Sequence, residues 1–166
     1  MLTKSVILIG MPGSGKSTIG KSIADKLGVD FVDTDRLIIS KAGKPLQTII
    51  SEDGLDSFMD MERKLLRELN TNAISIIATG GSAVLYEDAM AHLKELGNVV
   101  FLDADLPLLS KRLWNMESRG IAFADEDGLL GVYTEREPLY YKYSDIRIHV
   151  RGKTVAEIIQ EIINAL

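Results

Sequence analysis

One glycine-rich segment near the N-terminus constrains this chain more than any other feature. Residues 10–17 read Gly-Met-Pro-Gly-Ser-Gly-Lys-Ser and fit the pattern G-x-x-x-x-G-K-[ST]. An apolar run at residues 6–9 precedes them, and a pattern of helical period follows at residues 16–27. The motif therefore stands between a buried strand and the start of a helix, which predicts a βα unit joined by a tight loop.

This glycine-rich loop is predicted to bind phosphate groups. Glycines let the backbone curl so that successive N–H groups point inward, and the start of the following helix adds its positive dipole end. Lys16 is expected to contact the β- and γ-phosphates of a nucleotide, and the Ser17 hydroxyl is expected to ligate Mg²⁺. A glycine-rich turn without a ligand is the alternative, which the flanking strand and helix disfavour. The residues expected to contact the nucleotide here are Gly10, Gly13, Ser14, Gly15, Lys16, Ser17 and Thr18.

Short β-branched runs alternate with longer stretches of helical period along the chain, which is typical of an α/β fold with a parallel sheet. Strands are predicted at residues 5–9, 29–33, 75–79, 99–102 and 146–150. Helices are predicted at residues 16–27, 54–70, 86–96, 107–116, 133–143 and 154–165. No linker or repeat divides the sequence, so we expect residues 1–166 to form a single domain.

The segment at residues 117–132 differs from the rest of the chain. It holds Gly120, Gly128 and Gly131 together with four acidic residues. A long segment of this kind inside a compact domain is often a mobile element over a site, so we expect it to form a lid.

Composition excludes several classes of site. The chain has no cysteine, which excludes disulfides, thiolate zinc sites and cysteine nucleophiles, and its two histidines, His92 and His149, lie far apart in the sequence. A net charge of −5, from 19 basic and 24 acidic residues, argues against nucleic acid as the main partner. No apolar run approaches the ~20 residues of a membrane span, and no secretory signal is recognised. We therefore expect a cytoplasmic protein without a membrane partner.

The loop alone is compatible with a GTPase switch, an ATPase or a small-molecule kinase. A GTPase would need an Asn-Lys-x-Asp guanine-binding motif, and no asparagine of this chain is followed by lysine. Residues 99–103 resemble a Walker B strand, which would make Asp103 the Mg²⁺ ligand of an ATPase. Asp103 and Asp105 serve equally well as caps of the next helix, and Asp33 is a better-placed metal ligand.

Asp33 and Asp35 end the second predicted strand, and alternation along a strand sends both carboxylates to one side. Asp33 is expected to hold Mg²⁺ through a water molecule. Asp35 is expected to orient an acceptor hydroxyl and to take its proton as transfer proceeds. The alternative is that Thr34 or Asp35 only caps a helix that begins at Arg36.

Two further sets of residues leave alternatives open. Gly80 and Gly81 follow an apolar run and indicate either close approach of the backbone to a ligand or a tight strand-to-helix turn. For the basic residues, a solvated helix face and a ligand contact are equally compatible with the sequence. These residues are Arg112, Arg119 and Arg136.

Taken together, these motifs resemble the shikimate kinase family of P-loop kinases over nearly the whole chain. The resemblance implies a three-layer fold with a five-stranded parallel sheet of order 2-3-1-4-5, a lid, and transfer of the ATP γ-phosphate to a ring hydroxyl of a small hydroxy acid. Shikimate is the best single expectation. The alternatives are a related kinase with another acceptor, such as gluconate, and a nucleotide-binding regulator without turnover. The motifs are Gly-Met-Pro-Gly-Ser-Gly-Lys-Ser-Thr at 10–18, Phe-Val-Asp-Thr-Asp at 31–35, Gly54 with Phe58 and Glu62, Ala-Thr-Gly-Gly at 78–81, Arg119, and Glu-Arg-Glu-Pro-Leu-Tyr at 135–140.

The resemblance also implies roles for individual residues. Asp35 would bind the acceptor hydroxyls, Gly80 and Gly81 would lie against the substrate, and Arg136 would bind its carboxylate. Arg119 would neutralise charge on the transferred phosphate from the lid, and Arg112 would stack on adenine.

Three positions depart from the family pattern. Met59 stands where the family carries a second carboxylate-binding arginine, Ser82 where it usually has a third glycine, and Gly120 where it usually has a proline. Arg63 lies one helical turn beyond Met59, so it could supply the missing cation to the substrate. No coiled coil or apolar surface patch is recognised in the sequence, and a monomer is expected.

Overall fold

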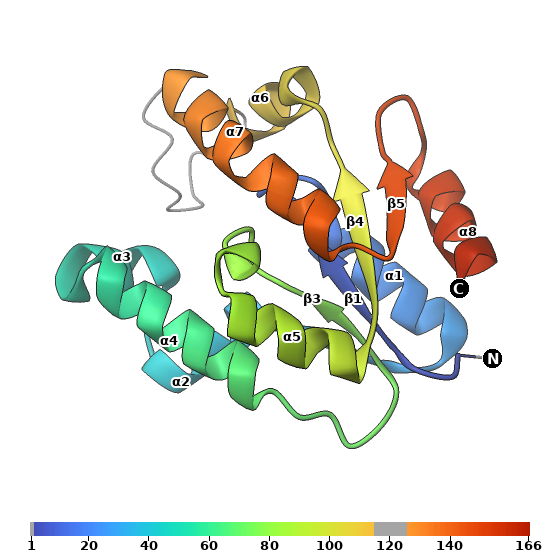
Figure 1. The fold of residues 1–166 in the computed structure, drawn as a ribbon, viewed down its shortest axis with the longest axis horizontal. Coiled ribbons are helices and arrows are strands. Elements are labelled where there is room, and N and C mark those ends of the chain that lie inside the picture. Colours follow the sequence, from blue (N-terminus) through green and yellow to red (C-terminus); the bar gives the residue numbers. More distant parts are fainter. Residues whose placement is uncertain (1, 115–125) are drawn as a thin grey trace.

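The computed structural model describes residues 2–114 and 126–166, which form a five-stranded parallel sheet with helices on both faces (Figure 1). The strand order is β2-β3-β1-β4-β5, which confirms the order that the family resemblance implies. The strands are β1 (Ser5–Ile9), β2 (Asp30–Asp33), β3 (Ser75–Ala78), β4 (Gly97–Asp103) and β5 (Ile146–His149).

The helices make the outer two layers. In Figure 1, α1 and α8 lie together on one face of the sheet, whereas α5 and α7 pack on β4 from the other face and α4 packs beside α5. None of the helices in the described ranges is long and apolar enough to cross a membrane. The helices are α1 (Lys16–Leu27), α2 (Thr34–Ala42), α3 (Leu46–Asp53), α4 (Leu55–Glu68), the 3-10 turn η1 (Ala83–Leu85), α5 (Glu87–Leu96), α6 (Leu106–Trp114), α7 (Glu126–Tyr143) and α8 (Val155–Ala165).

The central strands are apolar without alternation because helices cover both faces of the sheet. Every residue of β1 is buried, and β1 pairs in parallel with β4 from Ser5 opposite Gly97 to Ile9 opposite Phe101. On its other side β1 pairs with β3. Since parallel strands end at one edge of the sheet, the segments that follow β1, β2 and β3 meet there.

Two parts of the secondary structure differ from the prediction. Residues 34–53, where a helix from Arg36 is only the alternative and none is predicted further on, form the short helices α2 and α3. Helix α2 begins at Thr34 and its cap is Asp33, so Asp35 lies in the first turn of a helix and not at the end of a strand. Helix α7 begins at Glu126 rather than at residue 133, so Gly128 and Gly131 of the predicted lid lie in its first turns. The remainder of the predicted lid, residues 117–125 with Arg119 and Gly120, lies outside the described residues.

Candidate active site

The glycine-rich loop after β1 has the backbone that an anion site requires. Gly10, Gly13 and Gly15 have φ values of 148°, 81° and 100°, which favour glycine over other residues. Gly15 is the N-terminal cap residue of α1, and the Ser14 N–H donates to the Met11 carbonyl at 3.1 Å. The loop therefore curls back on itself directly before the helix begins.

Lys16 extends into this loop. Its Nζ donates to the carbonyl oxygens of Gly10 at 2.7 Å and Met11 at 2.9 Å, and the residue is only 7% exposed. An ammonium group held among loop carbonyls at a helix N-terminus provides the cation that a nucleotide phosphate needs.

Asp33 links α1 to α2. Ser17 Oγ donates to Asp33 Oδ2 at 2.7 Å, while Asp33 Oδ1 accepts from the N–H groups of Asp35 at 3.1 Å and Arg36 at 3.3 Å. Asp33 therefore caps α2 and also contacts the loop, so a capping role and a metal-binding role are compatible. One hydroxyl and one carboxylate oxygen side by side are hard donors of the kind Mg²⁺ prefers, and Mg²⁺ fills its other positions with water and phosphate oxygens.

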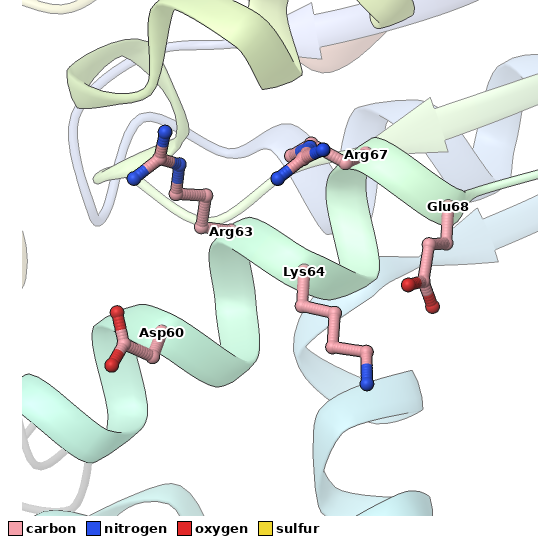
Figure 2. Close-up of a pocket in the computed structure, with 5 residues that line it drawn as sticks. All are labelled: Asp60, Arg63, Lys64, Arg67 and Glu68. Carbon is pink, nitrogen blue, oxygen red and sulfur yellow. The ribbon is translucent and has the colours of Figure 1, made fainter.

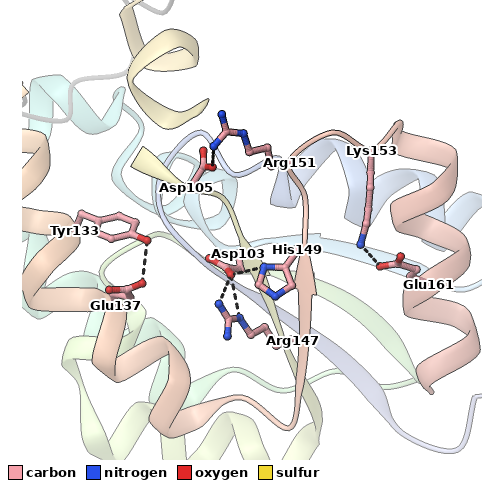
Figure 3. A network of polar contacts seen from close by, with 9 residues as sticks. All are labelled: Asp103, Asp105, Tyr133, Glu137, Arg147, His149, Arg151, Lys153 and Glu161. Carbon is pink, nitrogen blue, oxygen red and sulfur yellow. Dashed lines mark hydrogen bonds and ion pairs between the residues drawn. The ribbon is translucent and has the colours of Figure 1, made fainter. Parts of the chain in front are cut away.

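Asp103 is engaged elsewhere (Figure 3). Its Oδ2 accepts from Arg147 Nη2 at 2.6 Å and lies 2.9 Å from His149 Nδ1, so its partners come from the edge strand β5. Asp105 caps α6 through the Leu108 N–H at 3.1 Å. Among the described residues, Asp103 thus pairs with β5, Asp33 contacts the glycine-rich loop, and Asp105 caps α6.

The segment after β3 approaches the loop after β1 very closely. A Cβ atom at Gly81 would lie 2.6 Å from Pro12 Cδ, a distance that side chains do not reach. The Tyr140 hydroxyl of α7 donates to the Gly81 carbonyl at 2.6 Å, and Tyr140 is 1% exposed. Gly81 is therefore required where the segments from β1, β3 and α7 meet.

Gly80 lies against two carboxylates. A Cβ atom there would collide with Glu62 Oε1 and would lie 3.0 Å from Asp35 Oδ1. The Gly80 N–H donates to Thr34 Oγ1 at 3.3 Å, which ties this segment to the start of α2. The contact explains the glycine pair better than a turn alone, since the backbone here borders acidic groups.

Glu62 borders the site, although the sequence assigned no role to it. It is fully buried on α4, where Ser82 Oγ donates to its Oε2 at 2.5 Å and the Tyr86 hydroxyl donates to the same oxygen at 2.8 Å. Burial raises the pKa of the Glu62 carboxyl, and these two hydrogen bonds oppose the rise. A charged residue at helical spacing among apolar ones was the signal available, because Phe58 and Leu65 share its face.

Two of the three basic residues face the site rather than solvent alone. Arg112 of α6 donates from Nη1 to the Gly13 carbonyl at 2.9 Å. Arg136 of α7 has its Nε buried without a hydrogen-bond partner among the described residues, and its charge acts on Glu62 and Tyr140. The third, Arg119, lies outside the described residues.

The cation predicted near Met59 is not supplied by Arg63. Met59 packs against the hydrophobic core, whereas Arg63 Nη2 binds Asp88 Oδ2 at 2.9 Å and Arg67 Nε binds the same oxygen at 3.2 Å. Figure 2 shows both guanidinium groups on the outer side of α4, where they line a surface pocket of about 400 Å³. Arg63 thus contacts Asp88 of α5, and the structure gives no support to its role as a substitute for the missing arginine.

Comparisons with known proteins extend over nearly the whole chain. A family model for shikimate kinase matches residues 12–166. The shikimate kinase of Nitratidesulfovibrio vulgaris is 39% identical over 168 residues, covering 97% of this chain and 94% of that protein. The shikimate kinase of Sulfurihydrogenibium sp. is 33% identical over 163 residues, covering 98% of each. A solved shikimate kinase from Acinetobacter baumannii in complex with shikimate has a TM-score of 0.91 at 28% identity, covering 98% of this chain and 92% of that one.

Proposed function

The chain belongs to the shikimate kinase family, and from this premise we propose that it transfers the γ-phosphoryl group of ATP to a ring hydroxyl of shikimate, giving shikimate 3-phosphate. The observation that supports this most directly is the contact between the two substrate segments. Gly81, beside the acceptor residues, lies against Pro12 of the glycine-rich loop. A phosphate on that loop and an alcohol on the neighbouring segment would thus be adjacent, which is what a direct transfer needs.

On the donor side, the loop amides and Lys16 would bind the ATP phosphates, with Arg112 at the nucleotide end. The remaining contacts would come from Gly10, Gly13, Ser14, Gly15, Ser17 and Thr18. Ser17 and Asp33 fit a Mg²⁺ ion, which when bound would neutralise charge on the phosphates. The 2.7 Å contact between these two side chains keeps both oxygens on the same side of the loop.

On the acceptor side, Asp35 would accept a hydrogen bond from the hydroxyl that is phosphorylated. It would take the hydroxyl proton as the new P–O bond forms and the bond from the γ-phosphorus to the bridging oxygen breaks, which releases ADP. The Gly80 and Gly81 segment would border the ring, and Arg136 would bind the carboxylate. Arg119 would approach the transferred phosphate from the lid. A phosphoryl transition state is loose and spreads negative charge over its oxygens, so these residues act by positioning and by charge.

The test is the release of ADP by the purified protein with shikimate, quinate, gluconate or homoserine as acceptor. We expect turnover with shikimate well above the background with ATP alone, and identification of shikimate 3-phosphate as the product. Turnover of another acceptor only would contradict the assignment of shikimate while retaining the kinase. ATP binding by calorimetry without product from any acceptor would instead indicate a regulator.

Two further points belong to the proposal. Dependence on ATP favours the cytoplasm as the place where the protein works. The large apolar side chains that are exposed in the described ranges are spread over several elements, with no more than two on any one helix, and this supports a monomer.

A further inference from the structure

The two carboxylate oxygens of Glu62 differ in their contacts with the described residues. Its Oε2 accepts two hydrogen bonds, from Ser82 Oγ at 2.5 Å and from the Tyr86 hydroxyl at 2.8 Å. Its Oε1 is buried without a hydrogen-bond partner among the described residues and borders Gly80. The two hydroxyl groups thus hold Oε2 of the carboxylate, and Oε1 faces the acceptor end of the site.

The groups that face Glu62 come from several elements. Asp35 at the start of α2 raises its pKa, and Arg136 of α7 lowers it. Tyr86, directly before α5, is the other titratable neighbour, and its own pKa is raised by burial and by Glu62. A buried carboxylate beside a second carboxylate needs hydrogen-bond donors to keep one orientation.

Met59 lies three residues before Glu62 on α4, a spacing that brings side chains together on one helix face. The Met59 side chain packs against the core. An arginine at position 59 would be within reach of the Glu62 carboxylate, to which Ser82 already supplies a hydroxyl. Positions 59 and 82 therefore both border one buried group.

We propose that Ser82 and Tyr86 are positioning residues that hold the Glu62 carboxylate at the acceptor end of the site, and that positions 59 and 82 are energetically coupled through it. This inference rests on the proposed function in one respect, since Glu62 is taken to shape the end of the site that receives shikimate.

Kinetics of single variants test the positioning role. Ser82→Ala and Tyr86→Phe each remove one hydrogen bond to the buried Glu62 carboxyl group, so we expect KM for shikimate to rise about tenfold while KM for ATP stays unchanged. Ser82→Thr, which keeps the hydroxyl, is expected to retain a KM near that of the wild type. Tyr133→Phe is the matched control, because it removes the 2.9 Å bond from a tyrosine to Glu137 within α7. An equal rise of both KM values, or no change in either, would overturn the positioning role.

A double-mutant cycle tests the coupling without any substrate. The free energy of unfolding in urea is measured for the wild type, Met59→Arg, Ser82→Ala and the double variant. We expect the Met59→Arg substitution to restore at least half of the stability that Ser82→Ala removes, since the introduced guanidinium group gives Glu62 a new partner. Strictly additive effects would refute the coupling.

The two assays separate the inference from the proposed function. A wild type that does not phosphorylate shikimate contradicts the proposed function, and the unfolding cycle still decides whether positions 59 and 82 are coupled. An active wild type with additive unfolding energies contradicts the inference alone.

Discussion

Gly81 is the residue at which the segment after β3 contacts the glycine-rich loop, and there is no space for a side chain at this position. The Pro12 ring fills the space that a side chain at Gly81 would need, and the Tyr140 hydroxyl fixes the Gly81 carbonyl from the other side. Because a proline ring and a buried tyrosine have little room to move, the backbone itself would have to shift.

Gly81→Ala is therefore expected to lower kcat/KM for shikimate about 100-fold, since a displacement near 1 Å between reacting groups has an effect of this order. Steady-state ADP release measures the change. Gly131→Ala is the control, because that glycine lies in α7 with open space around it, and alanine there is expected to stabilise the helix by about 0.5–1 kcal/mol without loss of activity. Normal kinetics in Gly81→Ala would contradict the close approach of the two segments.

Glu62 gives a prediction about pH. Its pKa in the folded protein is raised above the ordinary 4.5, mainly by burial. The native state then keeps a proton that the unfolded state releases, so stability falls as pH rises from 4.5 toward the raised pKa. The Glu62→Gln variant lacks this fall. We therefore expect the melting temperature of the variant, relative to that of the wild type, to rise as pH increases over this range.

Glu157 is the control with the opposite sign. Hydrogen bonds from Thr154 lower its pKa below 4.5, so its contribution to stability is present above 4.5 and is lost as pH falls through the lowered value. Glu157→Gln is expected to be less stable than the wild type at neutral pH and equally stable in acid. The prediction for Glu62 would be wrong if both variants gave difference curves of the same sign.

At the scale of elements, α2 depends on a residue that also serves the site. Asp33 caps this helix and contacts Ser17, and two substitutions separate these tasks. Asp33→Asn keeps a good capping residue, so we expect the free energy of unfolding to change by less than about 0.5 kcal/mol while the Mg²⁺ needed for half-maximal activity rises about tenfold. Asp33→Ala also loses the cap and is expected to lower the free energy of unfolding by about 1 kcal/mol. Urea unfolding and a magnesium titration of ADP release measure the two effects. Equal destabilisation by both variants would show that capping does not depend on the side-chain oxygen.

The elements also show how much of the fold could be predicted from the sequence. The strands and the first helix were predictable because their signals are local, namely unbroken apolar runs and a motif of fixed spacing. The short helices α2 and α3 bury little apolar surface, with Ile38 in one and Ile49 in the other, so their periodicity is weak. In the site, the parallel sheet was enough to predict that the segments carrying Lys16, Asp33 and Gly81 meet at one edge of the sheet.

The partners of single side chains did not follow from the sequence. Arg63 and Asp88 lie on α4 and α5, and their contact depends on how these two helices pack. The hydroxyls that reach Glu62 come from Ser82 and Tyr86, on the segment between β3 and α5. Spacing within one helix predicts neither contact, since both are set by tertiary packing.

For the whole molecule, nucleotide binding is expected to raise the free energy of unfolding, because the glycine-rich loop joins the central strand to α1. At a MgATP concentration of 100 times Kd, a ligand that binds only the native state adds about 2.7 kcal/mol, which raises the melting temperature of a domain of this size by roughly 5–10 °C. Lys16→Ala is expected to abolish the shift together with turnover while melting near the wild-type temperature in the absence of ligand. Lys21→Ala, an exposed lysine of the same helix, should behave like the wild type. A full shift in Lys16→Ala would contradict the role of its ammonium group.

The contact of Gly81 with Pro12 also has a consequence for inhibitor chemistry. The loop proposed to bind the nucleotide and the segment proposed to border the hydroxy acid are in direct contact, since Pro12 packs on Gly81. A compound that joins an adenine nucleotide to a carboxylate-bearing ring therefore needs only a short and rigid tether to occupy both places at once, and such a tether loses little entropy on binding.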